Sequence, residues 1–222
     1  GVDGADRWLQ TAAATFGTLT FVFATTFSNH AVSALLLFAG SVAFLDRATF
    51  RAGLFLGAAA AIEIPVGGLF LAIVGLVVVV DSARARRWRP LATFVLGGSI
   101  PLAATAALGL LAYGDPRPAY LIPEAFRFEG SLHTGSGFAG ISGAPARLAY
   151  ALHALVGHRG LFVFSPILAL VVPALVICAI RRDEPHRRDR LGLAVAAAAT
   201  IAFHLVETSD GGGWAWGFRF FT

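Results

Sequence analysis

The chain has 222 residues, of which 57% are hydrophobic and only 14% are charged, and its mean hydropathy is +0.74. Because soluble domains carry about 25% charged residues, this composition excludes an ordinary soluble domain and predicts an all-α, polytopic membrane protein. The net charge is +4, with 17 basic residues that are all arginines. These arginines lie in short segments between apolar runs, which favours membrane topology over nucleic-acid binding as their explanation.

Seven apolar runs predict membrane-spanning helices, because about 20 helical residues cross a ~30 Å hydrocarbon core. Their expected bounds, in chain order, are 8–27, 30–45, 52–63, 66–80, 91–113, 161–180 and 191–206. The segment 114–160, rich in glycine, proline and serine, is expected to form an extracytoplasmic loop with an interfacial helix over 146–156. The whole chain, 1–222, is expected to form a single transmembrane domain.

The long apolar run over 52–80 is predicted to be a hairpin of two short helices. A single helix of this length would measure about 43 Å, which fits a bilayer only with strong tilt. Pro65 removes a backbone donor, and Gly67 and Gly68 lower helix propensity at the same place. We therefore expect a break between residues 63 and 68. Gly53 and Gly57 have the spacing that lets a helix pack closely on its neighbour.

The arginine-rich segments set the expected sidedness of the chain. Residues 81–90 contain four arginines and residues 181–190 contain five. The seven-span topology places twelve arginines on one side of the membrane and five on the other, and the richer side is expected to be cytoplasmic. Every other connection is therefore predicted to lie outside.

The predicted outer side gathers polar residues from separate segments. Asn29 and His30 follow the first span, where they either terminate helices or bind a substrate. Glu63 lies inside an apolar run beside the expected break, and acids in such positions tend to be functional. These three residues are candidates for the lining of a substrate cavity.

The C-terminal segment adds aromatic rings and a cation to the same side. Trp214 and Trp216 either belong to an interfacial aromatic belt or flank a substrate. Arg219, set among phenylalanines, suits the binding of a phosphate or pyrophosphate.

The sequence carries no recognisable metal or nucleotide motif. The histidines are scattered, and the glycines at 211–213 are followed by aromatic residues, so they form no nucleotide-type phosphate loop. We expect no evident cofactor and assign no metal ligands. The isolated acids Asp115 and Asp210 leave a divalent cation open.

Two motifs resemble segments of the bacterial GT-C superfamily of membrane glycosyltransferases, the relatives of protein O-mannosyltransferases and lipid A aminoarabinose transferases. The first is Arg159-Gly160-Leu161-Phe162-x-x-Ser165-Pro166. The second is Gly212-Gly213-Trp214-x-Trp216-Gly217-Phe218-Arg219-Phe220.

The resemblance implies an enzyme of the bacterial inner (plasma) membrane that moves a sugar from a polyprenyl-phosphate donor to an extracytoplasmic acceptor. Its partners would be the lipid-linked donor and membrane lipid. Arg219, and secondarily Arg159, would contact the donor phosphate. Glu63, Asn29 and His30 would line the cavity.

The chain contains no methionine and opens on a glycine, so we expect it to be part of a longer protein. The family's catalytic acid lies in its first extracytoplasmic loop, and no residue here is assigned that role. Two alternatives stay open. One is a multi-pass transporter or lipid flippase that uses Glu63 and His204 as a proton-coupled pair, and the other is a non-catalytic membrane scaffold.

Overall fold

The computed structural model describes residues 4–16, 29–118, 122, 144–157, 160–170, 173–174, 176–177, 181 and 186–207. Within these residues every regular element is a helix and no strand occurs, which confirms the all-α prediction. The helices are α1 (Gly4–Phe16), α3 (Asn29–Leu45), α4 (Thr49–Ile62), α5 (Ile64–Ala85), α6 (Arg89–Tyr113), α7 (Ala144–Val156), α8 (Leu161–Phe164) and α10 (Arg187–Glu207). A short 3₁₀ helix, η3 (Pro166–Leu170), follows α8.

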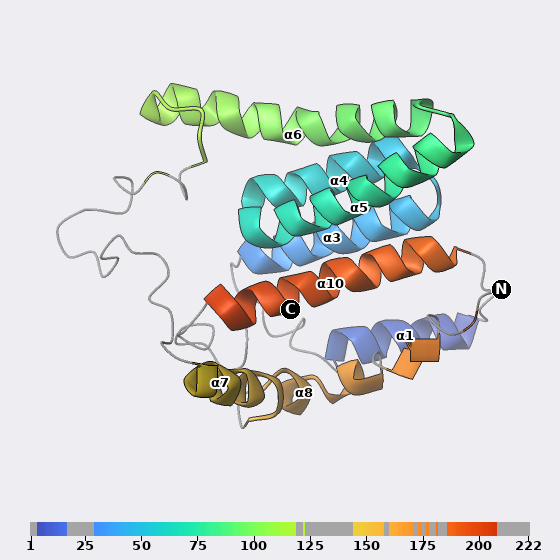
Figure 1. The fold of residues 1–222 in the computed structure, drawn as a ribbon, viewed down its shortest axis with the longest axis vertical. Helices are drawn as coiled ribbons and strands as arrows, with labels where there is room; N and C mark the ends of the chain where they lie inside the picture. Colours follow the sequence, from blue (N-terminus) through green and yellow to red (C-terminus); the bar gives the residue numbers. More distant parts are fainter. Residues whose placement is uncertain are drawn as a thin grey trace.

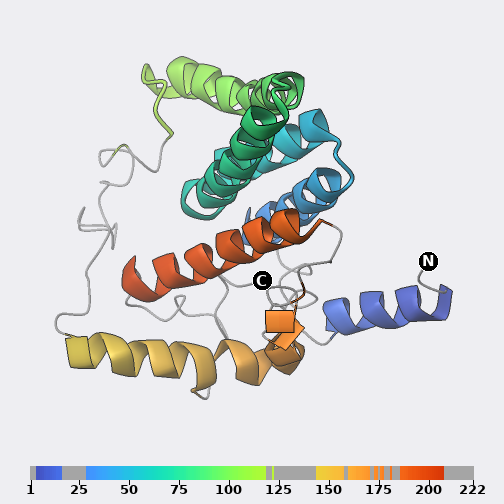
Figure 2. The same ribbon diagram turned by 45° about the vertical axis from the view of Figure 1, so that its right-hand side comes forward.

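Helix α4 is the centre of the bundle, because it packs against α3, α5 and α6 (Figure 1). Helix α10 comes from the far end of the sequence and lies along α5. The second view shows α7 and α8 in line below α10 (Figure 2). The central cluster of buried side chains includes Phe44, Leu56, Val74, Val78 and Phe94, so it draws on α3, α4, α5 and α6.

The break between α4 and α5 consists of one residue, Glu63, with extended backbone angles of φ −142° and ψ 90°. Its N–H donates to Ala59 O at 2.8 Å, and its carbonyl accepts from the N–H of Gly67 at 2.9 Å. Pro65 then stands in the first turn of α5, where its missing N–H costs no helical hydrogen bond. The predicted break and the pairing of the two helices are therefore present. The second arm, however, is not the short helix expected over 66–80, because α5 has 22 residues.

Glycines allow α4 to lie almost in backbone contact with α6. A Cβ atom added at Gly53 would collide with the carbonyl oxygen of Phe94, and one added at Gly57 would lie 2.6 Å from that of Gly98. Gly97, on α6, would meet the carbonyl oxygen of Phe50 in the same way. Gly53 and Gly57, the small residues noted in the sequence, thus lie on the surface where α4 contacts α6.

Two helices, α5 with 22 residues and α6 with 25, are long and apolar enough to span a membrane by length and composition. Only 22% and 17% of the residues in their most apolar windows are buried. Large apolar side chains such as Leu35, Phe38, Leu76 and Leu111 are instead exposed on the outside of the bundle. The apolar residues of these helices are therefore much more numerous than the internal packing requires.

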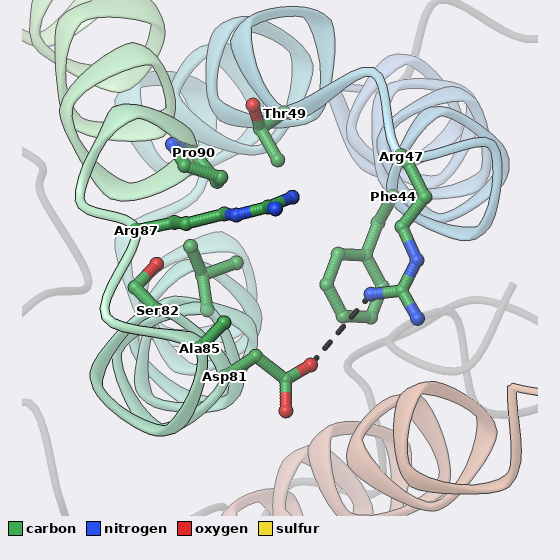
Figure 3. A pocket seen from close by; sticks show the side chains of 9 residues that line it. Phe44, Arg47, Thr49, Asp81, Ser82, Ala85, Arg87 and Pro90 are labelled. Carbon is green, nitrogen blue, oxygen red and sulfur yellow. Dashed lines mark ion pairs between the residues drawn. The ribbon is translucent and has the colours of Figure 1, made fainter.

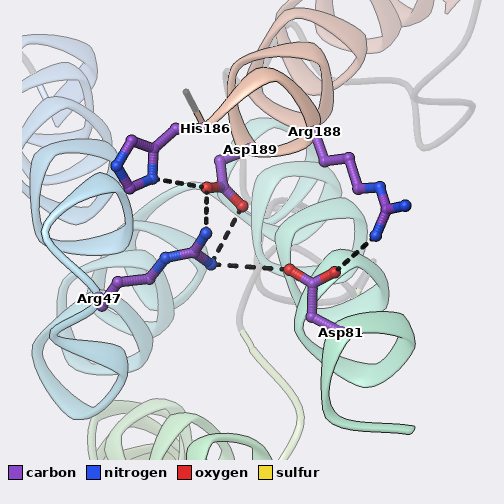
Figure 4. A network of polar contacts seen from close by, with 5 residues as sticks. All are labelled: Arg47, Asp81, His186, Arg188 and Asp189. Carbon is purple, nitrogen blue, oxygen red and sulfur yellow. Dashed lines mark hydrogen bonds and ion pairs between the residues drawn. The ribbon is translucent and has the colours of Figure 1, made fainter. Parts of the chain in front are cut away.

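Consecutive helices from α3 to α6 run in alternating directions, so every other turn between them lies at the same end of the bundle. The two ends differ in their chemistry. One end, here called the arginine end, holds the α3–α4 turn, the α5–α6 turn and the start of α10. There Arg47 Nη2 lies 2.8 Å from Asp189 Oδ2 and Arg47 Nη1 lies 3.6 Å from Asp81 Oδ2. Arg188 Nη1 lies 3.7 Å from Asp81 Oδ1, and His186 Nδ1 lies 3.3 Å from Asp189 Oδ2 (Figure 4). This network joins the α3–α4 turn to α5 and to the start of α10.

The helices extend further into the arginine segments than the apolar runs do. Helix α5 continues through Ala85, where Arg86 ends it in the left-handed conformation (φ 51°), and α6 begins at Arg89. The apolar run ends at residue 80, but a helix needs only backbone hydrogen bonds to continue past it.

The segment 161–170 does not form the first part of the continuous helix expected over 161–180. Helix α8 ends at Phe164, Ser165 has φ −136° and ψ 66°, and a 3₁₀ turn begins at Pro166. Proline disfavours the α conformation in the residue before it, which accounts for the break.

Candidate functional site

The end opposite the arginines contains a histidine–carboxylate pair that joins two predicted site residues. His30 lies in the first turn of α3, and its Nδ1 is 2.9 Å from Oε1 of Glu63, 33 positions away in the sequence. The two side chains are only 16% and 11% exposed. The predicted cavity residues His30 and Glu63 are therefore brought into direct contact.

The hinge explains why the Glu63 carboxylate is available for this contact. Residues just before a helix often use a side-chain oxygen to cap its first N–H groups. The Glu63 side chain makes no such bond, while its backbone N–H donates to α4 and its carbonyl accepts from α5. Its carboxylate reaches α3 instead.

A third titratable side chain comes from α10. His204 is 3% exposed, and its Nδ1 donates to the carbonyl oxygen of Thr200 on the same helix at 2.9 Å. Both Glu63 and His30 lie close enough to interact with the His204 ring electrostatically. The cluster of His30, Glu63 and His204, here called the hinge cluster, therefore collects groups from α3, the α4–α5 hinge and α10.

Ser33 adds a buried hydroxyl to the same helix face as His30. The two residues are three positions apart on α3, a spacing that places them on one face. Ser33 is 1% exposed, and its Oγ makes no hydrogen bond to any described residue. The sequence offers one signal for Ser33, its spacing of three residues from His30.

The His30–Glu63 pair has a defined capacity for proton transfer. If Glu63 is ionised it only accepts hydrogen bonds, so Nδ1 of His30 would donate, and Nε2 of a neutral ring would carry the lone pair. A carboxylate that fixes the tautomer and orientation of an imidazole in this way is a recurrent arrangement in general-base catalysis. Among the described residues no group of three or more His, Cys, Asp or Glu side chains could hold a metal ion.

Most of the other predicted site residues lie outside the part of the chain that the structure describes. These are Arg159, Trp214, Trp216 and Arg219. Asn29 begins α3 next to His30, but its side chain is also outside the described set.

Asp115 follows the C-terminal end of α6, at the opposite end of this helix from the arginine end. Arg117 binds its carboxylate through Nη2 at 2.6 Å and Nε at 2.8 Å, and the Arg117 backbone N–H donates to it at 2.8 Å. The hydrogen bond from the Arg117 side chain is the main reason that the pKa of Asp115 lies below its ordinary value. Asp115 is thus engaged in a local turn and belongs to no larger acidic group among the described residues.

No protein-family model, curated protein or solved structure matches the chain. The resemblance to the GT-C superfamily therefore rests on the two sequence motifs alone.

Proposed function

We propose that the chain is a multi-pass membrane protein with its arginine end on the cytoplasmic side. The exposed apolar surface of α5 and α6 supports this, since a lipid environment removes the cost of leaving such surface uncovered. The gathering of Arg47, Arg87 and Arg188 at one end supports the orientation, because arginines near helix ends remain on the cytoplasmic side. The hinge cluster then lies toward the extracytoplasmic face.

We infer further that the protein transfers a sugar from a polyprenyl-phosphate donor to an acceptor hydroxyl at that face. The observation that carries this proposal is the 2.9 Å contact between His30 and Glu63, two residues that the sequence already indicates as candidates. The motifs that end in Ser165-Pro166 and Arg219-Phe220 supply the family resemblance.

The proposed reaction accounts for the bond that forms, the bond that breaks and the proton that is released. The acceptor oxygen attacks the anomeric carbon, the bond from that carbon to the donor phosphate breaks, and the hydroxyl proton passes to a general base. His30, oriented by Glu63, can accept this proton at Nε2. Arg219, with Arg159 in support, would hold the negative charge of the departing prenyl phosphate. Trp214 and Trp216 would flank the sugar or the prenyl chain.

The test is release of prenyl phosphate from a labelled prenyl-phosphate sugar by the full-length protein in membranes. Glu63→Gln keeps the size of the side chain but removes its charge, and we expect turnover to fall by about 10²-fold or more. Arg219→Ala should raise the KM for the donor. Asp115→Asn is the matched control, because this carboxylate bonds only locally to Arg117 among the residues described.

Full activity of both Glu63→Gln and Arg219→Ala, at limiting and at saturating donor, would rule out the proposed site. A parallel measurement in a chelator decides whether a divalent cation takes part. Wild-type protein without any turnover would favour a non-catalytic scaffold.

A second candidate, a proton-coupled transporter or flippase, is favoured by one specific observation. His204 is buried on α10 and interacts with Glu63 and His30, so titratable groups from three separate segments share one place. Such groups inside a membrane protein often form proton relays. Uptake driven by a pH gradient discriminates the two candidates. In a transporter the wild-type protein should show this uptake and His204→Gln should abolish it, whereas in a transferase the wild-type protein should release prenyl phosphate and show no such uptake.

A further inference from the structure

A cavity of about 200 Å³ lies at the arginine end, away from the hinge cluster. It is formed where α3 ends, α4 begins, α5 ends and α6 begins. This volume has room for several waters of ~30 Å³ each, or for one phosphate group. The lining residues are Phe44, Arg47, Thr49, Val78, Asp81, Ser82, Ala85, Arg87 and Pro90.

Arg87 is the cation that reaches into this cavity. Figure 3 shows its side chain extending from the α5–α6 turn, with Thr49 and Pro90 on one side and Ser82 and Ala85 on the other. It makes no ion pair within the described part of the chain. Arg47, on the opposite wall, is held by Asp189 and Asp81. The cavity therefore contains one guanidinium already compensated and one that still lacks a negative partner among these residues.

Ser82 supplies a hydrogen-bond donor on the side of the cavity that carries Arg87. Its side chain is 3% exposed, and its Oγ has no hydrogen-bond partner among the described residues. A buried hydroxyl without a partner is uncommon in folded proteins and is destabilising. A ligand with acceptor oxygens would satisfy this hydroxyl and the Arg87 guanidinium together.

Asp81 is the one acid in the lining, and its charge is already offset. It lies between Arg47 at 3.6 Å and Arg188 at 3.7 Å (Figure 4). The surrounding turn also carries Arg84, Arg86 and Arg89, all exposed. The potential at the cavity is therefore expected to be positive.

An apolar groove of about 340 Å³ also starts at Asp81 and runs between α5 and α10. Arg188 stands at its charged end. Its remaining lining is almost entirely aliphatic and consists of Ile73, Leu76, Val77, Val80, Leu191, Gly192 and Val195. The cationic cavity and the aliphatic groove share the residue Asp81. Together they suit a molecule whose anionic head binds in the cavity and whose hydrocarbon chain lies in the groove.

We propose that the cavity binds a phosphate oxyanion between Arg87 and Ser82. The adjoining groove favours an anionic phospholipid of the cytoplasmic leaflet as its carrier. Arg87 donates charge-assisted hydrogen bonds to the phosphate, and Ser82 donates from its hydroxyl. This site is separate from the proposed transfer site and does not depend on it; only the choice of a cytoplasmic-leaflet lipid as carrier rests on the proposed membrane orientation.

The test uses the full chain purified in a non-ionic detergent at ~0.15 M salt, where interactions between distant surface charges are largely screened. The probes are short-chain phosphatidylglycerol, phosphatidylcholine with the same chains, and inorganic phosphate. The readout is the rise in unfolding temperature with probe concentration, which gives an apparent Kd. We expect phosphatidylglycerol to stabilise the protein and phosphatidylcholine to have little effect.

Two variants that each remove one positive charge show whether the probe binds in the cavity. Arg87→Gln should raise the apparent Kd about tenfold or more, the loss expected for charge-assisted hydrogen bonds. Arg84→Gln, from the same arginine segment but outside the cavity lining, should change it less than about twofold. Ser82→Ala should give an intermediate loss, and as a smaller side chain it fits the site without steric conflict.

If inorganic phosphate binds with the same dependence on Arg87 and phosphatidylglycerol does not, the site is supported and its ligand is a free phosphate. Equal losses in Arg87→Gln and Arg84→Gln would mean only diffuse attraction and would overturn the proposal. The absence of stabilisation by all three probes would overturn it as well.

Discussion

Two buried serines give the clearest unusual chemistry at the scale of single residues. Ser33 and Ser82 are almost fully enclosed, and neither hydroxyl has a hydrogen-bond partner among the described residues. Hydroxyls in helices commonly bond back to a carbonyl one turn earlier, as Ser41 does to Leu37 O at 2.7 Å. Ser33 and Ser82 do not, and they lie at opposite ends of the bundle beside His30 and Arg87. Each end therefore retains a donor that a ligand could satisfy.

The first prediction concerns the stability cost of the Ser82 hydroxyl. Ser82→Ala should stabilise the ligand-free protein by up to about 1 kcal/mol, because it removes a buried group that pays for desolvation without a hydrogen bond in return. Thermal unfolding in phosphate-free detergent measures this change. A clear loss of stability would mean that the hydroxyl has a partner in the folded protein and would remove one support of the phosphate site.

Individual residues show what the sequence could and could not indicate. The sequence indicates Glu63 as a candidate, because an acid inside an apolar run is costly. Its contact with His30 spans 33 residues and depends on how α3 packs against the hinge, which no local pattern encodes. Asp189 belongs to the arginine-rich segment 181–190, yet it is 1% exposed and paired with Arg47. A charged sequence context does not reveal burial when the partner comes from another helix.

At the scale of elements, the hinge between α4 and α5 is the feature that positions the hinge cluster. Pro65 lies in the first turn of α5, and Gly67 lets the new helix turn back directly against α4. A Cβ atom at Gly67 would collide with the backbone of Ala59 and Ala60, whereas one at Gly68 would meet nothing. The two neighbouring glycines therefore have different roles.

The second prediction uses this difference. Gly67→Ala should destabilise the protein by about 1–3 kcal/mol, the usual cost of overpacking, and should also displace the Glu63 carboxylate. Gly68→Ala should be neutral or stabilising by up to about 1 kcal/mol, because alanine favours the helix and has open space there. Thermal unfolding of both variants in detergent is the measurement. Similar stability of the two would show that α4 and α5 do not approach as closely as described.

Sequence patterns predicted these elements best where backbone chemistry was local. The break near residue 63 followed from a proline and two glycines, and α3 over 29–45 agrees closely with its apolar run. Helix ends were less accurate, since α5 continues through Ala85, five residues past the apolar run. Hydropathy shows where the apolar run ends. The end of a helix depends instead on capping, here by Arg86 in the left-handed conformation.

At the scale of the whole molecule, the helices separate two kinds of chemistry. Helix α5, with 22 residues, is about 33 Å long and places Glu63 and the arginine end at its opposite tips. α10 repeats the arrangement, with Asp189 near its start and His204 near its end. This distance is close to the thickness of a hydrocarbon core. The proposed transfer site and the proposed phosphate site would therefore face different sides of one membrane.

The third prediction tests this orientation directly, and it bears on both proposals. In a Cys178→Ser background, which removes the chain's one cysteine, Ala83→Cys places a thiol at the arginine end and Pro116→Cys places one beyond α6. Both positions are exposed, so local burial does not limit their reaction. A membrane-impermeant maleimide applied to intact cells should label position 116 and leave position 83 unlabelled until the cells are permeabilised. Labelling of both positions in intact cells, or of position 83 alone, would contradict the orientation. The hinge cluster could not then serve an extracytoplasmic acceptor, and the Arg87 cavity could not meet lipids of the cytoplasmic leaflet.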